Sequence, residues 1–250
     1  MRNNISKAKR ALLGGLGALW GATVAAGFAL GRPAAPGAAR LPHWVALSSS
    51  GLLTIIGWGY RQALRKGPDA DYATHIATGM TFGALGDVLM PHSVPGGMAA
   101  FAVGHVAYVR GMLRLQRQKG LSSNAVLYGA WSAWLGAAVA GWYAVVARSP
   151  KGVTPLGWAG LGYSLLLAST CGVAWGTALQ NRRYLPLAIG GTLFLLSDVV
   201  IAMRLFNPEL FRAIPDWIRG DLVWLTYAPA QALLVHSIPI AAGDCASSKD

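Results

Sequence analysis

Long apolar segments follow one another along almost the whole of this 250-residue chain. A helix needs about 17–25 predominantly apolar residues to cross a bilayer, because each residue adds about 1.5 Å along the axis. Eight segments meet this length, at approximately residues 11–30, 43–60, 72–90, 97–114, 124–147, 155–179, 184–205 and 221–241. The connections are short and rich in Pro and Gly, so we expect one integral membrane domain over residues 1–250, an all-α bundle of eight transmembrane helices.

The composition excludes the other broad classes of protein. Hydrophobic residues make up 54% of the chain and charged residues only 12%, against roughly 25% charged in a soluble domain. Disordered chains are poor in apolar residues, so disorder is excluded as well. Residues 1–30 place basic residues before an apolar stretch, as a signal peptide does. The stretch is longer than a signal sequence normally has, which favours an uncleaved first span.

Basic residues set the expected orientation in the membrane. The chain has 21 Lys and Arg against 9 Asp and Glu, a net charge of +12, and the basic residues cluster between the apolar segments. With a cytoplasmic N-terminus, roughly two thirds of them lie on the cytoplasmic side, which is the bias of membrane proteins. We therefore expect both termini in the cytoplasm, a bacterial cytoplasmic (inner) membrane location, and contact with anionic lipid instead of nucleic acid.

Two acidic residues, Asp87 and Asp198, lie inside apolar spans, while the others lie in connections, at a span edge or in the tail. An ionised Asp in mid-membrane costs about 2.5–3.5 kcal/mol, and no Lys or Arg lies mid-span to pair with either one. A carboxyl removed from water favours its neutral form, and two neighbouring carboxyls divide into one acid and one base. The pair therefore indicates acid–base chemistry within the membrane.

Helical spacing places other polar and small residues on the same faces as these carboxyls. Residues three or four apart in a helix share a face. The predicted faces are His75, Gly79, Gly83 and Asp87 in the third span; Phe101, His105 and Tyr108 in the fourth; Gly191, Phe194 and Asp198 in the seventh; and Tyr227 and Gln231 in the eighth. Gly79 and Gly83 form a G-x-x-x-G, which permits close approach of a neighbouring helix and favours an Asp87 that faces protein.

Several alternatives remain at these positions. His105 alone is also typical of an interhelical hydrogen bond, and Tyr108 and Tyr227 are also typical of interfacial aromatic residues. The histidines His75, His105 and His236 could join an Asp in a metal site. The sequence contains no H-E-x-x-H, no G-x-S-x-G and no G-x-x-x-x-G-K, which weakens zinc-hydrolase, serine-lipase and nucleotide-binding interpretations.

The chain resembles the lysoplasmalogenase family of integral membrane proteins, the YhhN-like or transmembrane protein 86 family. The matching motifs are Gly83-x-x-Gly86-Asp87-Val88-Leu89, Ala100-Phe101-x-x-Gly104-His105-x-x-Tyr108, Gly190-Gly191-x-x-Phe194-x-x-Ser197-Asp198-x-x-Ile201-Ala202 and Tyr227-x-x-Ala230-Gln231. Their order and placement agree with the family over residues 72–240. The first two spans match less well, because Leu41-Pro42-His43 stands where the family often has Lys-Pro.

This resemblance implies eight helices and hydrolysis of the vinyl ether bond of a lysoplasmalogen, which yields a fatty aldehyde and glycerophospho-ethanolamine or -choline. It implies no metal and no organic cofactor. The expected partners are the lysophospholipid substrate and membrane lipid, and the oligomeric state stays open. Vinyl ethers hydrolyse when an acid protonates the β carbon and water attacks the resulting oxocarbenium ion, so two carboxyls in acid and base roles suit the reaction.

We therefore expect Asp87 and Asp198 to be catalytic, without assigning which is the acid. The residues expected to orient the substrate or the carboxyls are His105, Tyr108, Ser197, Tyr227, Gln231, Gly83 and Phe194. Two other functions remain open: a proton-coupled transporter that uses the Asp pair as a relay, and a metal-dependent lipid hydrolase.

Overall fold

The structure, a computed structural model, describes residues 5–35, 37–64, 66–150 and 152–243. Every regular element in these residues is a helix, which confirms the all-α fold. The long helices are α1 (Lys7–Leu30), α2 (His43–Ala63), α3 (Pro68–Leu89), α4 (Val94–Gln118), α5 (Asn124–Trp142), α6 (Pro155–Gln180), α7 (Leu185–Phe206) and α10 (Leu222–Ala241). Each of them coincides with one of the predicted apolar segments.

Four short elements interrupt the connections or extend the long helices. A π-helix, η1 (Tyr143–Ala147), continues α5, and a 3₁₀ turn, η2 (Arg182–Tyr184), precedes α7. The connection from α7 to α10 contains α8 (Pro208–Arg212) and α9 (Asp216–Arg219), which the sequence did not predict. Single π turns in long helices often occur at functional sites, which makes the end of α5 a candidate position for one.

Local sequence signals explain where several helices begin. The hydroxyls of Ser93 and Thr154 accept hydrogen bonds from backbone N–H groups in the first turns of α4 and α6. Pro68 and Pro155 occupy the first positions of α3 and α6, where a missing N–H costs nothing. Hydroxyl caps satisfy donors that the helix itself leaves open. The polar and proline-rich connections therefore fix the helix starts.

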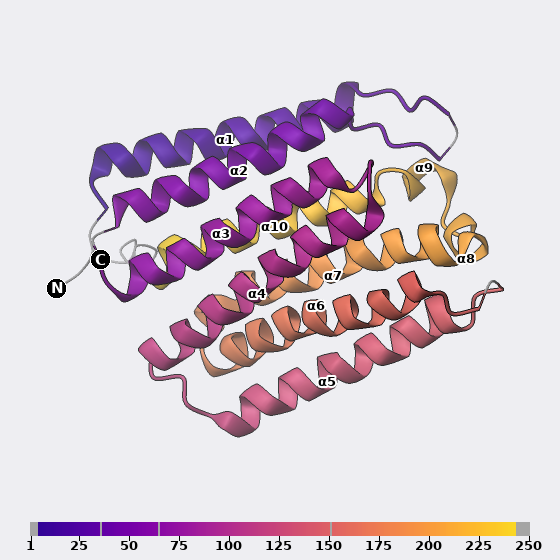
Figure 1. Cartoon of the computed structure of the whole chain (residues 1–250). Coiled ribbons are helices and arrows are strands. Elements are labelled where there is room, and N and C mark those ends of the chain that lie inside the picture. Colours follow the sequence, from indigo (N-terminus) through magenta and orange to yellow (C-terminus); the bar gives the residue numbers. More distant parts are fainter. Residues whose placement is uncertain (1–4, 36, 65, 151, 244–250) are drawn as a thin grey trace.

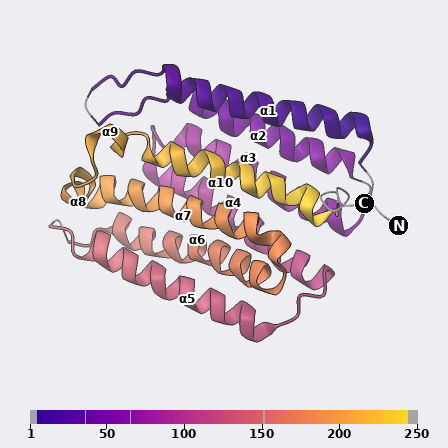
Figure 2. The same ribbon diagram turned by 180° about the vertical axis from the view of Figure 1, so that it is seen from behind.

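The helices form an elongated bundle in which α1 and α5 lie at opposite edges (Figures 1 and 2). The other long helices lie between them, with α3 packed on α4, α7 on α10, and α2 on both α3 and α10. The beginning of α1 and the end of α10 lie at the same end of the bundle (Figure 1). A central layer of α3, α4, α7 and α10 therefore lies farthest from the bundle's edges.

Length and composition indicate an integral membrane protein. Four segments of the described chain are long and apolar enough to cross a membrane: Lys7–Leu30, Asn124–Ala147, Pro155–Gln180 and Arg182–Phe206. Large apolar side chains such as Trp44, Ile55 and Trp158 are more than half exposed on the outside of the bundle, as lipid contact requires. The eight crossings and the cytoplasmic termini stay predictions.

Glycine brings α3 and α4 unusually close together. A Cβ on Gly79 would overlap the ring of Tyr108, and one on Gly104 would lie 3.0 Å from the Gly79 carbonyl oxygen. Gly83 instead faces α10, where its Cβ would lie 3.6 Å from the Tyr227 hydroxyl. The close helix approach predicted from this G-x-x-x-G is confirmed at Gly79, where α4 is the neighbour, whereas a Cβ at Gly83 would make only ordinary contact with α10.

An ion pair with a buried carboxylate joins the connection after α1 to the start of α10. Asp221, at the edge of the last predicted span, is only 2% exposed. Its Oδ2 accepts a hydrogen bond of 2.6 Å from Nε of Arg40, and its Oδ1 accepts one of 2.6 Å from the Arg40 backbone N–H. The carboxylate therefore has a structural role that its place near a loop does not reveal.

Candidate functional site

Asp87 lies in the last turn of α3 and is held by side chains from two other helices. Its Oδ2 accepts hydrogen bonds from the Ser50 hydroxyl of α2 at 2.5 Å and from the Tyr227 hydroxyl of α10 at 3.1 Å. Gly83, one turn earlier, faces Tyr227 and Gln231 of α10, and a Cβ added there would make only ordinary contact with them. The predicted face of α3 thus points into the bundle.

Ser50 links Asp87 to Gln231. Its Oγ lies 2.5 Å from Oδ2 of Asp87 and 3.2 Å from Oε1 of Gln231. A hydroxyl carries one proton and can donate to only one of these oxygens. Both contacts are satisfied at once when Asp87 is protonated, because Asp87 then donates to Ser50 and Ser50 donates to Gln231. The arrangement can therefore hold a proton on Asp87.

Asp198 lies in α7 among fewer polar groups. Its Oδ2 accepts a hydrogen bond of 2.6 Å from the Tyr163 hydroxyl of α6, and its Oδ1 lies 3.3 Å from the Ser197 hydroxyl. The Ser197 hydroxyl also donates to the Phe194 carbonyl oxygen at 2.7 Å. The structure records no ion pair for either carboxyl with a basic residue in the part of the chain it describes.

Aromatic rings fill the space that connects the two carboxyls. The ring of Phe194 packs edge-on against Tyr227 at 5.0 Å between centroids and against His105 at 4.7 Å. His105 in turn packs against Tyr163 at 5.9 Å. A continuous path of contacts thus runs from Asp87 through Tyr227, Phe194, His105 and Tyr163 to Asp198, and every member of this path except Tyr163 was predicted from the sequence.

The hydroxyl of Tyr108 and one ring nitrogen of His105 serve packing between helices. His105 Nδ1 lies 3.0 Å from the Thr170 hydroxyl of α6, which is the interhelical hydrogen bond that its position also allowed. The Tyr108 hydroxyl donates to Sδ of Met80 at 3.2 Å and bonds neither carboxyl. Nε2 of His105 and Nε2 of Gln231 are buried with no hydrogen-bond partner among the described residues, so both remain free to bind a polar group.

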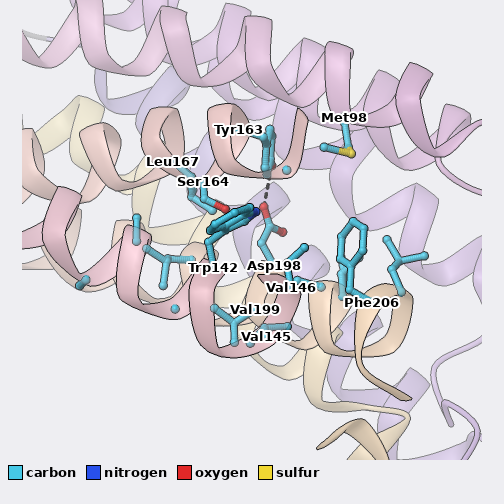
Figure 3. A pocket seen from close by; sticks show the side chains of 18 of the residues that line it. Met98, Trp142, Val145, Val146, Tyr163, Ser164, Leu167, Asp198, Val199 and Phe206 are labelled. Atoms are coloured by element: carbon cyan, nitrogen blue, oxygen red, sulfur yellow. Dashed lines mark hydrogen bonds between the residues drawn. The ribbon is translucent and has the colours of Figure 1, made fainter. Parts of the chain in front are cut away.

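A largely apolar cavity opens beside Asp198, between the C-terminal part of α5 with η1, the N-terminal half of α6 and the C-terminal half of α7 (Figure 3). Its volume is about 120 Å³, and it is partly open to its surroundings. Asp198 and Tyr163 lie in the middle of its lining, with Leu167 toward one end and Phe206 toward the other (Figure 3). Asp87 is not among the lining residues.

The histidines and acidic residues that a metal site would need do not lie together in the described residues. No group of three or more His, Cys, Asp or Glu side chains with suitable geometry occurs in residues 5–35, 37–64, 66–150 and 152–243. The histidines of the third and fourth spans take part in packing between different helices. His75 of α3 lies against Gly111 of α4, and His105 of α4 lies against Thr170 of α6. The structure does not assemble the donor set that the three histidines suggested.

Two residues at the site were missed by the sequence reasoning. Ser50 ends a run of three serines in an apolar span, Ser48-Ser49-Ser50, and such a run is a signal that could have been used. Tyr163 is one of eight tyrosines, and nothing in its surroundings in the sequence marks it as the partner of a carboxyl 35 residues away. Only the packing of α6 on α7 brings them together.

The predicted site residues thus gather around one aromatic centre. Gly83, Asp87, Tyr227 and Gln231 form one end, and Ser197 and Asp198 form the other end, beside the cavity. No curated protein and no solved structure matches the chain. Residues 41–238, which include every one of these side chains, match the YhhN family, and the chain belongs to that family.

Proposed function

We propose that this protein hydrolyses the vinyl ether bond of a lysoplasmalogen within the membrane. The observation that carries the proposal is Asp198, a carboxyl without a recorded basic partner, hydrogen-bonded to Tyr163 on the wall of an otherwise apolar cavity. A carboxyl in such surroundings exchanges protons more readily with a bound ligand than with bulk water. The YhhN family is associated with hydrolase activity, which supports an enzyme over a transporter.

The proton balance of the reaction suits a carboxyl at this place. A neutral carboxyl gives its proton to the β carbon of the vinyl ether, and the C–O unit becomes an oxocarbenium ion. The carboxylate left behind stabilises this cation and then takes a proton from the attacking water. The hemiacetal so formed breaks into a fatty aldehyde and glycerophospho-ethanolamine or -choline, which carries the freed hydroxyl. The carboxyl has its proton back, and one water has been consumed.

Asp87 supplies the second carboxyl of the proposed pair. It lies outside the cavity lining, and Tyr227 and Phe194 stand between it and the surroundings of His105. Its hydrogen bonds to Ser50 and Tyr227 allow it to hold a proton when Asp198 is ionised and to carry the charge when Asp198 is protonated. Two carboxyls that share one low-dielectric region favour opposite protonation states. We assign Asp198 to direct proton exchange with the lipid and Asp87 to a charge-balancing role.

The direct test is aldehyde release by the purified protein in lipid nanodiscs. The substrate is a lysophospholipid with a 1-O-alkenyl chain, and its control is the 1-O-alkyl analogue, which has no double bond to protonate. We expect aldehyde from the alkenyl lipid alone, at a rate that chelators leave unchanged. The proposal is wrong if the alkenyl lipid stays intact, and a lipid or proton flux across proteoliposomes without bond cleavage would then favour the transporter.

A further inference from the structure

The cavity beside Asp198 has a lining that selects for hydrocarbon. Asp198, Tyr163 and Ser164 bring a carboxyl or hydroxyl to it, and the indole N–H of Trp142 is already bonded to the Gly157 carbonyl oxygen at 2.8 Å. The rest of the lining is aliphatic, aromatic or thioether surface. Apolar cavities favour apolar ligands, and the polar groups here are gathered beside Asp198, where water also has hydrogen-bond partners.

Gly160 keeps the end of the cavity near Phe206 open. It is buried in α6 and lines the cavity. A Cβ at this position would make only ordinary contact with the Phe206 ring, at 3.8 and 3.9 Å, so no backbone or packed side chain requires a glycine there. Gly104 and Gly172, by contrast, have backbone atoms against them at 3.0 and 2.6 Å. Gly160 therefore differs from the packing glycines of the bundle.

The space next to Phe206 could have been filled by the protein itself. A larger apolar side chain at position 160 would gain contacts with the lining, because only the Phe206 ring lies within 4 Å of an added Cβ. The cavity has room for a ligand, is lined by apolar side chains and contains one carboxyl. These are the properties of a binding site for a hydrocarbon chain that carries a polar group at one end.

We propose that this cavity binds the single hydrocarbon chain of the lipid substrate and that Gly160 determines how long a chain it accepts. The identity of the chain as that of an ether lipid rests on the proposed function, whereas the preference for hydrocarbon rests on the lining alone. The chain enters from bilayer hydrocarbon, so added methylenes gain little binding free energy, and the limit is set by the space next to Phe206. A leucine at position 160 takes up about the space of four methylenes.

The experiment uses a lipid that the proposed reaction cannot consume. A saturated 1-O-alkyl glycerophosphocholine with a diazirine at the end of its chain is photolysed with the protein in nanodiscs, and labelled peptides are quantified by mass spectrometry. We expect label on the cavity segments of α5, α6 and α7, and displacement by unlabelled alkyl lipids only up to the chain length that the cavity holds. In Gly160→Leu this length limit is about four methylenes shorter than in the wild type.

Gly162→Leu is the matched control. Gly162 lies in the same helix, is exposed, has no atom within 4 Å of an added Cβ and does not line the cavity. It should leave labelling and chain-length dependence unchanged. Should Gly160→Leu fail to fold, as judged by its thermal unfolding, Gly160→Ala is used, and its chain-length limit should shift by about one methylene.

The outcomes separate this inference from the proposed function. Labelling of the cavity with the expected chain-length shift, but without aldehyde release from an alkenyl lipid, refutes the hydrolase and keeps the chain site. Aldehyde release with label spread evenly over the outer surface, or with identical behaviour of Gly160→Leu and Gly162→Leu, refutes the chain site and keeps the hydrolase.

Discussion

The two intramembrane carboxyls have opposite surroundings. Asp87 is held by hydroxyls from α2 and α10, and one of these hydroxyls continues to Gln231. Asp198 has one strong donor, Tyr163, and faces a largely apolar cavity of about 120 Å³. A carboxyl tied into a hydrogen-bond network is rigid and inaccessible, whereas one on a cavity wall can meet a ligand. Two similar sequence motifs, Gly-Asp and Ser-Asp, therefore place their carboxyls in different surroundings.

The largest effect is expected from Asp198→Asn. An amide of the same shape cannot give or take the proton, so we expect aldehyde release to fall by about 10³-fold, within the range of general acid–base catalysis. Asp216→Asn, at a side chain 59% exposed outside the bundle, is the control and should keep full activity. Turnover by Asp198→Asn within tenfold of the wild type would remove Asp198 from the chemistry.

Asp87→Asn should cost less, about 10²-fold in aldehyde release, because Asp87 acts from outside the cavity. Binding of the saturated alkyl lipid to this variant should be unchanged, since no cavity contact is lost. The comparison between the two carboxyls fails if Asp87→Asn is the more damaging substitution, because the lipid would then have to approach Asp87. Near-normal turnover would exclude a two-carboxylate mechanism.

Tyr163→Phe tests the single donor of Asp198. A hydrogen bond to a charged group contributes about 1.5–3 kcal/mol, so its loss should lower the rate by about tenfold or more. Tyr128→Phe, at a side chain 59% exposed on α5, is the control for the substitution type. Equal rates for the two variants would show that Asp198 needs no orientation by Tyr163.

Ser50→Ala tests the surroundings of Asp87 and should mainly lower the free energy of unfolding. Removing one hydrogen-bond partner of a buried carboxyl costs about 1–2 kcal/mol of unfolding free energy, which thermal unfolding in detergent measures. Activity should fall by less than about threefold, because Tyr227 still holds Asp87. Ser48→Ala removes an exposed hydroxyl that bonds only within its own helix and is the control. A larger loss of activity than in Tyr163→Phe would reverse the comparison.

The sequence predicted the helices because their signals are local and strong. Runs of apolar residues, serine and threonine caps, and prolines in first turns place each long helix within a few residues. Asp87 and Asp198 were found for a related reason, since an ionisable residue in an apolar run is costly wherever the helix packs. Helical spacing indicated Phe194, Tyr227 and Gln231, and the resemblance to family motifs added Ser197.

The cavity and its contacts could not be predicted, because they depend on three-dimensional packing. Tyr163 meets Asp198 only through the packing of α6 on α7, and the cavity is lined by residues of several helices, Gly160, Phe206 and the π-helical end of α5 among them. The ion pair of Arg40 and the buried Asp221 joins residues 181 positions apart. Contacts of this range leave no periodic pattern in the sequence.

The central claim is that the protein protonates the β carbon of a vinyl ether, and the reaction in D₂O tests it most directly. Mass spectrometry of the fatty aldehyde should show one deuterium on the carbon next to the carbonyl, acquired in the step that breaks the double bond. The same aldehyde, incubated unlabelled with the Asp198→Asn protein, corrects for exchange through the enol. An aldehyde without deuterium, or no aldehyde at all, would contradict the account.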